Sequence, residues 1–336
     1  MADMTDSAFC RLVREVQKSL SQEVVESLSR GIDKNLFFVT QQLNDLETQQ
    51  LVVFREMVSA EAVVRGNEKT LDMTDIHPAE RPLVQQIFGS DPAVMAAAAA
   101  KTAAEHQPEG FDINMGCPVY KIVHNFNGAA LMQEPKLAAE IVKAVKAVID
   151  VPLSIKIRLG WSNPTACIEF AKVLEAAGAD MLTIHGRTKA QGYSGVADWE
   201  MIGRAKAGVK IPVLCNGDVH SFDLIPKALE ISGCDGVLIA RGALGNPWIF
   251  SQFNDFIAGH RVAEPSLAER LAVVNRHLDL HLEQYGEAAV PTFRKHLSWY
   301  FKGLPHFKRF KDPLMKAGTS ADLRHVLSQM TETVTV

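Results

Sequence analysis

From residue 51 onward, short apolar runs alternate with longer segments in which apolar residues recur every three or four positions. The short runs predict β-strands and the longer segments predict amphipathic helices. Helices are expected, for example, over 136–149 and over 165–177, where Gly178 would end the helix. The alternation is typical of repeated βα units around a parallel sheet. The expected strands cover 51–57, 82–88, 110–115, 152–158, 179–185, 211–215 and 235–240.

Parallel strands in this number fit either a (β/α)8 TIM barrel that lacks one strand or an open doubly wound sheet. Polar side chains recur where the expected strands end, and barrel enzymes build their sites at that end. An open sheet would gather such side chains near one switch point. The distribution therefore favours an α/β barrel. The polar residues at strand ends are Glu56, Gln86, Asn114, Lys156, Arg158, His185, Asn216 and Arg241.

Both ends of the chain depart from this pattern. The opening MADMTDSAFCRLVRE predicts a helix capped by Thr5 or Asp6, so the first barrel strand is missing and would lie upstream of Met1. After residue 250 only amphipathic helix is expected. We therefore expect a TIM-barrel domain over 1–250, with a helical insertion at 17–50, and a C-terminal helical domain over 251–336.

The composition is that of an ordinary globular protein, with 47% hydrophobic and 22% charged residues. The chain contains no apolar run of the ~20 residues that a membrane span needs and no secretory signal, so we expect a cytoplasmic monomer. The net charge is −4, but residues 290–316 carry seven basic residues and one acidic residue. That segment, with Arg294, Lys295 and Lys302, is a candidate for contacts with nucleic-acid phosphates.

Five cysteines are widely spaced and form no CxxC pair, which argues against both a disulfide framework and a zinc site. No cluster of carboxylates and histidines has ligand spacing, so no metal is expected. Cys167, Cys215 and Cys234 lie in apolar patterns and are expected in the core. Cys117, between Gly116 and Pro118 at the end of a strand, is either another small hydrophobe or a thiol available for chemistry.

Two glycine-containing loops, 216–221 and 240–248, follow the last two expected strands. Barrels form phosphate sites at these positions from backbone N–H groups and a helix N-terminus. Lys156 alternates with Ile155 and Ile157 and would point into the barrel, where an anion or a ligand acceptor must meet it. Together with Gln86 and His185, these features suit flavin mononucleotide (FMN) better than a metal.

Eleven segments spread over nearly the whole chain carry a resemblance to a known family. They resemble the tRNA-dihydrouridine synthases, most of all the bacterial B-type branch. The resemblance implies an FMN-binding barrel followed by a helical tRNA-recognition domain, and reduction of a D-loop uridine with NADPH. The segments are MADMTDSAF, FREMVSAEAVV, ERPLVQQIFGSDP, DINMGCP, GAALM, IKIRLGW, IHGRT, QGYSGVADW, NGDV, RGALGNPW and RKHLSWYFKGLP.

The resemblance also implies roles for individual residues. Cys117 would be the general acid, because hydride delivery to C6 of uracil leaves negative charge that a proton at C5 must quench, and a thiol is mostly protonated at neutral pH. Substrate contacts are expected from Glu56, Asn114, Arg158, Arg187, Lys189 and Tyr193. The flavin would be held by Met1, Gln86, Lys156, His185, Asn216, Gly217, Asp218, Arg241 and Gly242.

Three departures from the family pattern keep alternatives open. The APMAGVTD opening is reduced to ADMTD, residues 17–50 are inserted, and Ala240 replaces a common glycine. One alternative is a tRNA-binding remnant that is inactive because the first strand is missing. Another is a flavin dehydrogenase acting on free pyrimidines, which would not need the basic helical segment.

Overall fold

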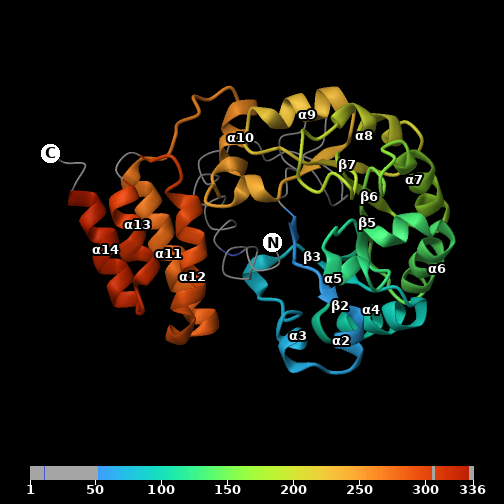
Figure 1. The fold of residues 1–336 in the computed structure, drawn as a ribbon, viewed down its shortest axis with the longest axis horizontal. Coiled ribbons are helices and arrows are strands. Elements are labelled where there is room, and N and C mark those ends of the chain that lie inside the picture. Colours follow the sequence, from blue (N-terminus) through green and yellow to red (C-terminus); the bar gives the residue numbers. More distant parts are fainter. Residues whose placement is uncertain (1–10, 12–51, 305–306, 333–336) are drawn as a thin grey trace, which may run out of the picture. The chain divides into compact units, whose positions relative to one another are not determined.

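The computed structural model describes residue 11 and residues 52–304 and 307–332. Met1, the predicted N-terminal cap and the predicted insertion at 17–50 lie outside these residues. The described chain divides into two compact units, one ending at Ala240 and one that contains Arg11 and resumes at Arg241. We call them the barrel unit and the helical unit and describe each by itself (Figure 1).

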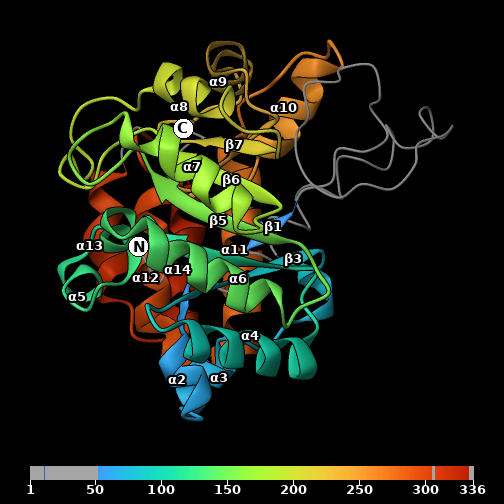
Figure 2. The ribbon, with the colours of Figure 1, turned by 90° about the vertical axis from the view of Figure 1, so that its right-hand side faces the viewer.

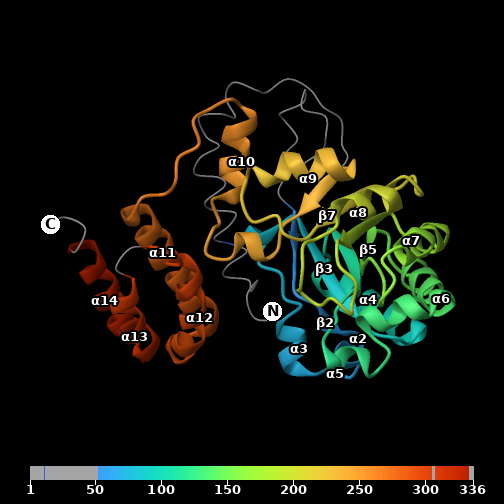
Figure 3. The same ribbon diagram turned by 45° about the horizontal axis from the view of Figure 1, so that its top comes forward.

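The barrel unit contains one parallel sheet whose order follows the chain, β1-β3-β4-β5-β6-β7-β8, with β2 also paired to β3 (Figure 3). A doubly wound sheet would reverse its order at a switch point, so the sequential order identifies the barrel arrangement. No pairing joins β8 to β1 within the described residues, and the sheet is a curled half-barrel. The strands are β1 (Val53–Phe54), β2 (Val58–Ser59), β3 (Leu83–Phe88), β4 (Gly110–Met115), β5 (Leu153–Arg158), β6 (Met181–His185), β7 (Val213–Asn216) and β8 (Gly236–Leu238).

Helices cover the outer face of this sheet (Figure 2). The longest, α4 (Pro92–His106), begins where the Asp91 carboxylate accepts a hydrogen bond from the Val94 N–H. The expected helices are confirmed as α6 (Pro135–Lys146) and α7 (Ala166–Ala176), and Gly178 follows α7 with φ of 105°. The others are α2 (Ala60–Val64), α3 (Glu68–Asp72), α5 (Tyr120–Val123), α8 (Trp199–Lys206) and α9 (Leu224–Ser232), with 3-10 turns at Pro78–Glu80 and Gly128–Gln133.

Strand alternation separates an apolar face from a polar face. In β5, Ile155 and Ile157 are fully buried on one side, whereas Lys156 points to the other side. There its Nζ reaches Asn216 Oδ1 of β7, 3.2 Å away across β6. The apolar side packs against the helices, so the polar side is the inner face of the half-barrel and the predicted orientation of Lys156 is confirmed.

The helical unit contains the C-terminal helices that the sequence predicted. In α11 (Leu267–Tyr285), Ser266 and Glu269 form a capping box. Tyr300, at the end of α12 (Val290–Tyr300), is fully buried and its hydroxyl lies 3.1 Å from His277 Nδ1. None of the helices within the described residues is long and apolar enough to cross a bilayer. The other elements are α10 (Ile249–Ile257), α13 (Lys308–Lys316) and α14 (Ser320–Glu332), with 3-10 turns at Arg241–Ala243 and Glu287–Ala289.

Candidate active site

Polar side chains of four strands, β3, β4, β5 and β7, lie on the inner face of the half-barrel. Gln86 and Asn114 are joined by a hydrogen bond from Asn114 Nδ2 to Gln86 Oε1 (2.9 Å). Lys156 and Asn216 are joined by the bond described above, and Asn216 Nδ2 donates to the Leu238 carbonyl (2.7 Å). The structure therefore brings together four of the residues that the sequence singled out at strand ends.

Cys117 lies directly after β4 in a loop whose backbone is held at both ends. Asn114 Oδ1 accepts hydrogen bonds from the N–H groups of Gly116 (3.1 Å) and Cys117 (2.9 Å). The Cys117 carbonyl accepts from the Ala129 N–H (3.0 Å), and a Cβ on Gly128, whose φ is 58°, would lie 2.8 Å from that carbonyl oxygen. The half-exposed thiol of Cys117 is thus carried on a constrained backbone.

The other described cysteines behave as core residues, as the sequence predicted. Cys167, Cys215 and Cys234 are fully buried. Burial raises the pKa of the Cys167 and Cys234 thiols to about 11 and raises that of Cys215 further. Cys117 is therefore the one described cysteine that is not fully buried.

Lys156 is a cation on the inner face, two residues before Arg158 on the same strand. Burial lowers its pKa to about 8, and the positive charge of Arg158 acts in the same direction. The negative charge of Asp112 opposes this shift most, followed by Cys117 and Glu56. Cys117 and Glu56 therefore lie within electrostatic reach of the ammonium group, as their predicted roles require.

Arg158 joins the Cys117 loop to the loop that follows β6. The side chain is 2% exposed, and its Nε donates to the Gly116 carbonyl (2.7 Å). Its NH1 group donates to the carbonyls of Thr188 (3.0 Å) and Gly192 (2.8 Å). The guanidinium also lies 5.6 Å from the ring centre of Tyr193. Arg158 therefore fixes two loops at the mouth of the half-barrel through their backbones.

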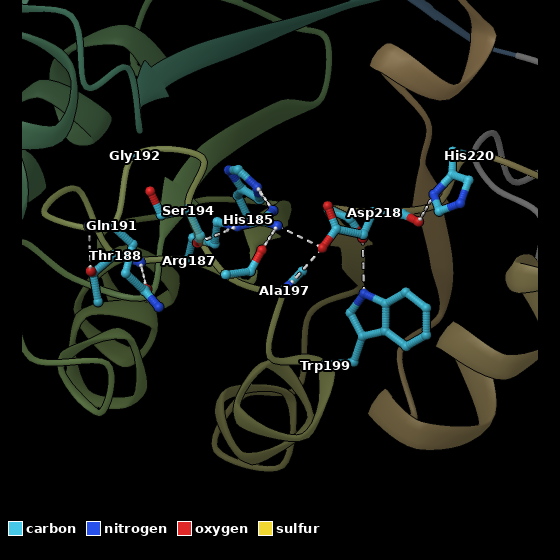
Figure 4. A network of polar contacts seen from close by, with 12 residues as sticks. His185, Arg187, Thr188, Gln191, Gly192, Ser194, Ala197, Trp199, Asp218 and His220 are labelled. Carbon is cyan, nitrogen blue, oxygen red and sulfur yellow. Dashed lines mark hydrogen bonds and ion pairs between the residues drawn. The ribbon is translucent and has the colours of Figure 1, made fainter.

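A second network links the ends of β6 and β7 (Figure 4). Arg187 NH2 lies 2.7 Å from Asp218 Oδ2, which also accepts from the Ala197 N–H (2.7 Å). Gly217, with φ of 115°, packs so closely that a Cβ would lie 2.8 Å from the His185 ring. The predicted flavin residues His185, Gly217 and Asp218 are therefore adjacent, and Arg187 neutralises the Asp218 carboxylate.

Some contacts escaped the sequence analysis. Asp112 is fully buried on the inner face and accepts a hydrogen bond from Gln86. Residues two apart in a strand point to the same face, so the spacing between Asp112 and Asn114 indicates that both side chains point inward. Lys189 Nζ lies 4.1 Å from the ring centre of Trp161. This contact joins two loops that are distant in sequence, and no local sequence pattern predicts it. Tyr193 is 47% exposed, beside Arg158, and leaves a large aromatic surface at the mouth.

The remaining predicted residues lie elsewhere. Arg241 and Gly242 belong to the helical unit, so their predicted place beside the flavin stays a prediction. Arg294 NH1 donates to the carbonyls of Met315 (2.7 Å) and Ala317 (3.2 Å). Lys295 is half-buried and Lys302 is exposed. Within the part of the chain that the structure describes, no group of three or more His, Cys, Asp or Glu side chains could hold a metal ion.

Comparisons with known proteins agree with the resemblance read from the motifs. The family model described as "Dihydrouridine synthase (Dus)" matches residues 1–335. A "Probable tRNA-dihydrouridine synthase 1" of Synechocystis is 37% identical over 318 residues, which cover 94% of this chain and 88% of the relative. The "tRNA-dihydrouridine synthase B" of Pseudomonas putida is 38% identical over 264 residues, covering 77% of this chain and 78% of the relative.

Among solved structures, similarity is weaker. An old yellow enzyme homologue from Zymomonas mobilis matches with a TM-score of 0.46 and 11% identity, over 80% of this chain and 88% of that chain. A 2-naphthoyl-CoA reductase complex matches with a TM-score of 0.47 and 15% identity, over 62% of this chain and 44% of that chain. The assignment therefore rests on the family model and the sequence relatives: the chain belongs to the dihydrouridine synthase family.

Proposed function

We propose that this protein reduces a D-loop uridine of tRNA to 5,6-dihydrouridine, with FMN as cofactor, NADPH as reductant and Cys117 as general acid. The observation that carries the proposal is the half-exposed Cys117 thiol at the end of β4, held by Asn114 and within electrostatic reach of Lys156. Family membership supports the same reaction, since the relatives described above are named for it.

The inner face has a donor set that suits the polar edge of a flavin ring. Lys156 carries three N–H donors, and Asn216 Oδ1 accepts one of them. Gln86, Lys156, His185 and Asn216 would hold the ring edge, and the backbone of Gly217 and Asp218 would meet the phosphate. FMN supplies hydride chemistry when bound. The ammonium group of Lys156 stabilises negative charge on an acceptor in front of it.

The chain's own residues would position the uracil and handle its proton. Asn114 and Arg158 both bond to the peptide group between Gly116 and Cys117, so the backbone that carries the sulfur keeps one position relative to the inner face. Reduction of the C5=C6 bond needs a hydride at C6 and a proton at C5, and the Cys117 thiol donates that proton. Tyr193 and Lys189 at the mouth would contact the nucleotide that carries the uracil.

The helical unit would supply contacts to tRNA. Lys302 lies on the exposed surface, as do Lys308, Arg309, Lys311 and Lys316 along α13. Exposed cations grouped on neighbouring helices attract RNA phosphates, and each contact releases counterions. Arg294 already donates to two carbonyls within the unit, so Lys302 and the α13 cations are better suited to contact phosphates directly.

The test is a comparison of wild-type protein, Cys117→Ala and the matched control Cys167→Ala. We expect the wild type to carry yellow flavin and to form dihydrouridine in tRNA, detected by mass spectrometry of nucleosides. Cys117→Ala should keep the flavin and the oxidation of NADPH but lose product by about 100-fold, because the acid acts after hydride transfer begins. Cys167→Ala should keep the flavin, the oxidation of NADPH and the formation of dihydrouridine.

Three outcomes would contradict the proposal. Wild-type product formation by Cys117→Ala would return Cys117 to a structural role. A colourless protein that still binds tRNA would identify an inactive RNA-binding remnant. A protein that reduces free uracil, or that oxidises dihydroorotate, and does not reduce uridine in tRNA would be identified as a dehydrogenase of free pyrimidines.

A further inference from the structure

Asp112 is a buried carboxylate on the inner face to which the proposed reaction gives no task. It lies on β4, in register with Gln86 of β3 and Ser154 of β5, and its side chain is fully buried. Oδ1 accepts a hydrogen bond from Ser154 Oγ (2.5 Å), and Oδ2 accepts one from Gln86 Nε2 (2.5 Å). A carboxylate is costly to bury, so its retention here calls for a role.

The hydrogen bonds continue from Asp112 to the backbone of the candidate acid. Gln86 Nε2 donates to Asp112, which leaves Gln86 Oε1 to accept from Asn114 Nδ2 (2.9 Å). Asn114 Oδ1 is then the end that accepts from the N–H groups of Gly116 and Cys117. The chain of contacts runs Asp112, Gln86, Asn114, Cys117, and each step is a hydrogen bond of 2.9 Å or less.

An amide has one donating end and one accepting end, so fixing one end fixes the other. If the Gln86 amide turned over, its NH2 group would face the NH2 group of Asn114. The Asn114 amide would then be favoured in the opposite orientation, in which its oxygen no longer faces the Cys117 N–H. An ionised carboxylate only accepts hydrogen bonds and therefore selects one orientation of Gln86. Burial raises the pKa of Asp112 to about 7, whereas the hydrogen bonds from Ser154 and Gln86 and the charge of Lys156 favour the ionised form. In the structure both carboxyl oxygens accept hydrogen bonds, Oδ1 from Ser154 and Oδ2 from Gln86, which is the arrangement that orients the Gln86 amide.

We propose that Asp112 is a positioning residue that sets the orientation of Gln86 and Asn114 and, through them, the position of Cys117. The inference rests on the proposed function for its meaning in catalysis. Its geometric content is independent: loss of the acceptor at residue 112 frees both amides and loosens the backbone around Cys117. Asp112 itself touches neither the thiol nor, in this proposal, the uracil.

The experiment compares Asp112→Ser, Asp112→Asn and the control Thr183→Val. Serine is too short to reach Gln86, whereas asparagine keeps an oxygen for Gln86 Nε2 and can turn its NH2 group toward the Ser154 hydroxyl. Thr183 is fully buried on the same face, in register with Lys156, and has no part in the chain of contacts, so its change matches the loss of a buried polar group.

The first readout is the rate at which iodoacetamide alkylates Cys117, measured by mass spectrometry of the peptide. We expect Asp112→Ser to change this rate on the order of 10-fold, and Asp112→Asn and Thr183→Val to stay near wild type. This measurement needs no substrate, so it remains informative if the proposed reaction is wrong. Equal alkylation rates in all four proteins would overturn the positioning role.

The second readout is the dihydrouridine formed per NADPH consumed. Asp112→Ser should lower this ratio on the order of 10- to 100-fold while the KM for tRNA stays near wild type. Flavin content is measured alongside, and the ratio is expressed per bound flavin, because Gln86 is also proposed to hold the flavin. In the Cys117→Ala background, Asp112→Ser should add little further loss, because both changes act on one proton transfer. A parallel fall of every activity and of Tm, with no rescue by Asp112→Asn, would show a merely structural residue.

Asn114→Ala cuts the same chain of contacts at its last link and replaces Asp112→Ser if that variant does not fold. Its expected result is the same change in alkylation rate. Wild-type alkylation in a folded Asn114→Ala protein would show that the chain does not hold Cys117, and the proposal would fail while the proposed reaction could still stand.

Discussion

The barrel unit and the helical unit both bury titratable side chains, but they use them differently. On the inner face of the barrel, Asp112 accepts a hydrogen bond from Gln86 and Lys156 donates one to Asn216. Arg158 donates to the Gly116 carbonyl in the loop that carries Cys117. In the helical unit, His277 and His296 are buried with ring centres 4.7 Å apart, packed against Phe293 and Tyr300. Asp112 and Arg158 are linked by hydrogen bonds to the backbone at Cys117, a residue that is only partly buried, whereas His277 and His296 fill a core.

The difference teaches that burial of a charged residue type is not by itself a sign of function. What distinguishes Asp112 and Arg158 is that their hydrogen bonds lead to the backbone of the loop that carries Cys117. In the helical unit, the functional candidates are instead the exposed cations. The comparison therefore predicts that interior changes affect chemistry in one unit and only stability in the other.

The largest expected effect comes from Lys156→Met in the barrel interior. Removing the ammonium group should weaken flavin retention and slow flavin reduction by NADPH about 100-fold, because a preorganised charge in a partly dry site is lost. Flavin absorbance after gel filtration and stopped-flow reduction measure the two effects. Lys143→Met, an exposed lysine of α6, is the control. Wild-type flavin content with wild-type reduction kinetics would remove Lys156 from the site.

A smaller effect is expected from reversing two exposed charges of the helical unit, Lys302→Glu with Lys308→Glu. Affinity for tRNA should fall about 10-fold near 0.1 M salt, and the salt slope should decrease by somewhat under one unit per lost contact. Flavin content should not change. The matched control is Lys136→Glu with Lys143→Glu on α6, which alters net charge equally. If control and test variants bind tRNA alike, the RNA is held elsewhere.

The smallest effect on activity is expected from the buried histidines. Their replacement should leave dihydrouridine formation at neutral pH unchanged and should alter only the stability of the protein in acid. Burial lowers the pKa of His277 well below 6.5 and that of His296 to about 3, and nearby positive charge acts in the same direction. The unfolded chain therefore binds more protons, so the free energy of unfolding should fall as pH drops below 6.5. For His296 the fall should approach about 1.4 kcal/mol per pH unit down to about pH 3, and His277 should act in the same direction.

Urea unfolding at several pH values, followed by circular dichroism, measures this slope. His296→Leu should lower the slope of the free energy of unfolding against pH by the contribution of one bound proton. His325→Leu, at an exposed position, is the matched control. Dihydrouridine formation at pH 7 should be the same in both variants. A slope equal to that of the wild type in His296→Leu would mean that this histidine does not drive acid unfolding.

Much of the fold could be predicted because strands such as β4 and β5 carry apolar side chains on one face and polar side chains on the other, which leaves a period-two signal although both faces are largely buried. The expected strand 110–115 coincides with β4, and Lys156 points inward because Ile155 and Ile157 point outward. The first expected strand, 51–57, is less regular in the structure, where β1 and β2 lie on either side of Glu56. Periodicity does not report such interruptions.

The site could be predicted only in part because its contacts join residues distant in sequence. Strand ends could be read from the pattern, so Gln86, Asn114 and Asn216 were found. Arg158 was predicted to contact substrate, and its bonds to the carbonyls of Thr188 and Gly192 depend on the path of a loop. Asp112 was overlooked because an acidic residue inside an apolar run carries no motif of its own.

The bridge made by Arg158 has a consequence for how this region can change over time. In the loop after β6 the guanidinium donates to the main-chain carbonyls of residues 188 and 192 and lies beside the Tyr193 ring. The two carbonyl bonds depend on the path of the backbone and not on the side-chain atoms of those two residues. Gly192 has a φ of 57°, which favours glycine, so substitution is easier at the exposed Tyr193 than at residue 192. A residue gained or lost between the two carbonyls would move them away from Arg158. Specificity can drift by substitution at Tyr193, whereas insertions and deletions would release the mouth.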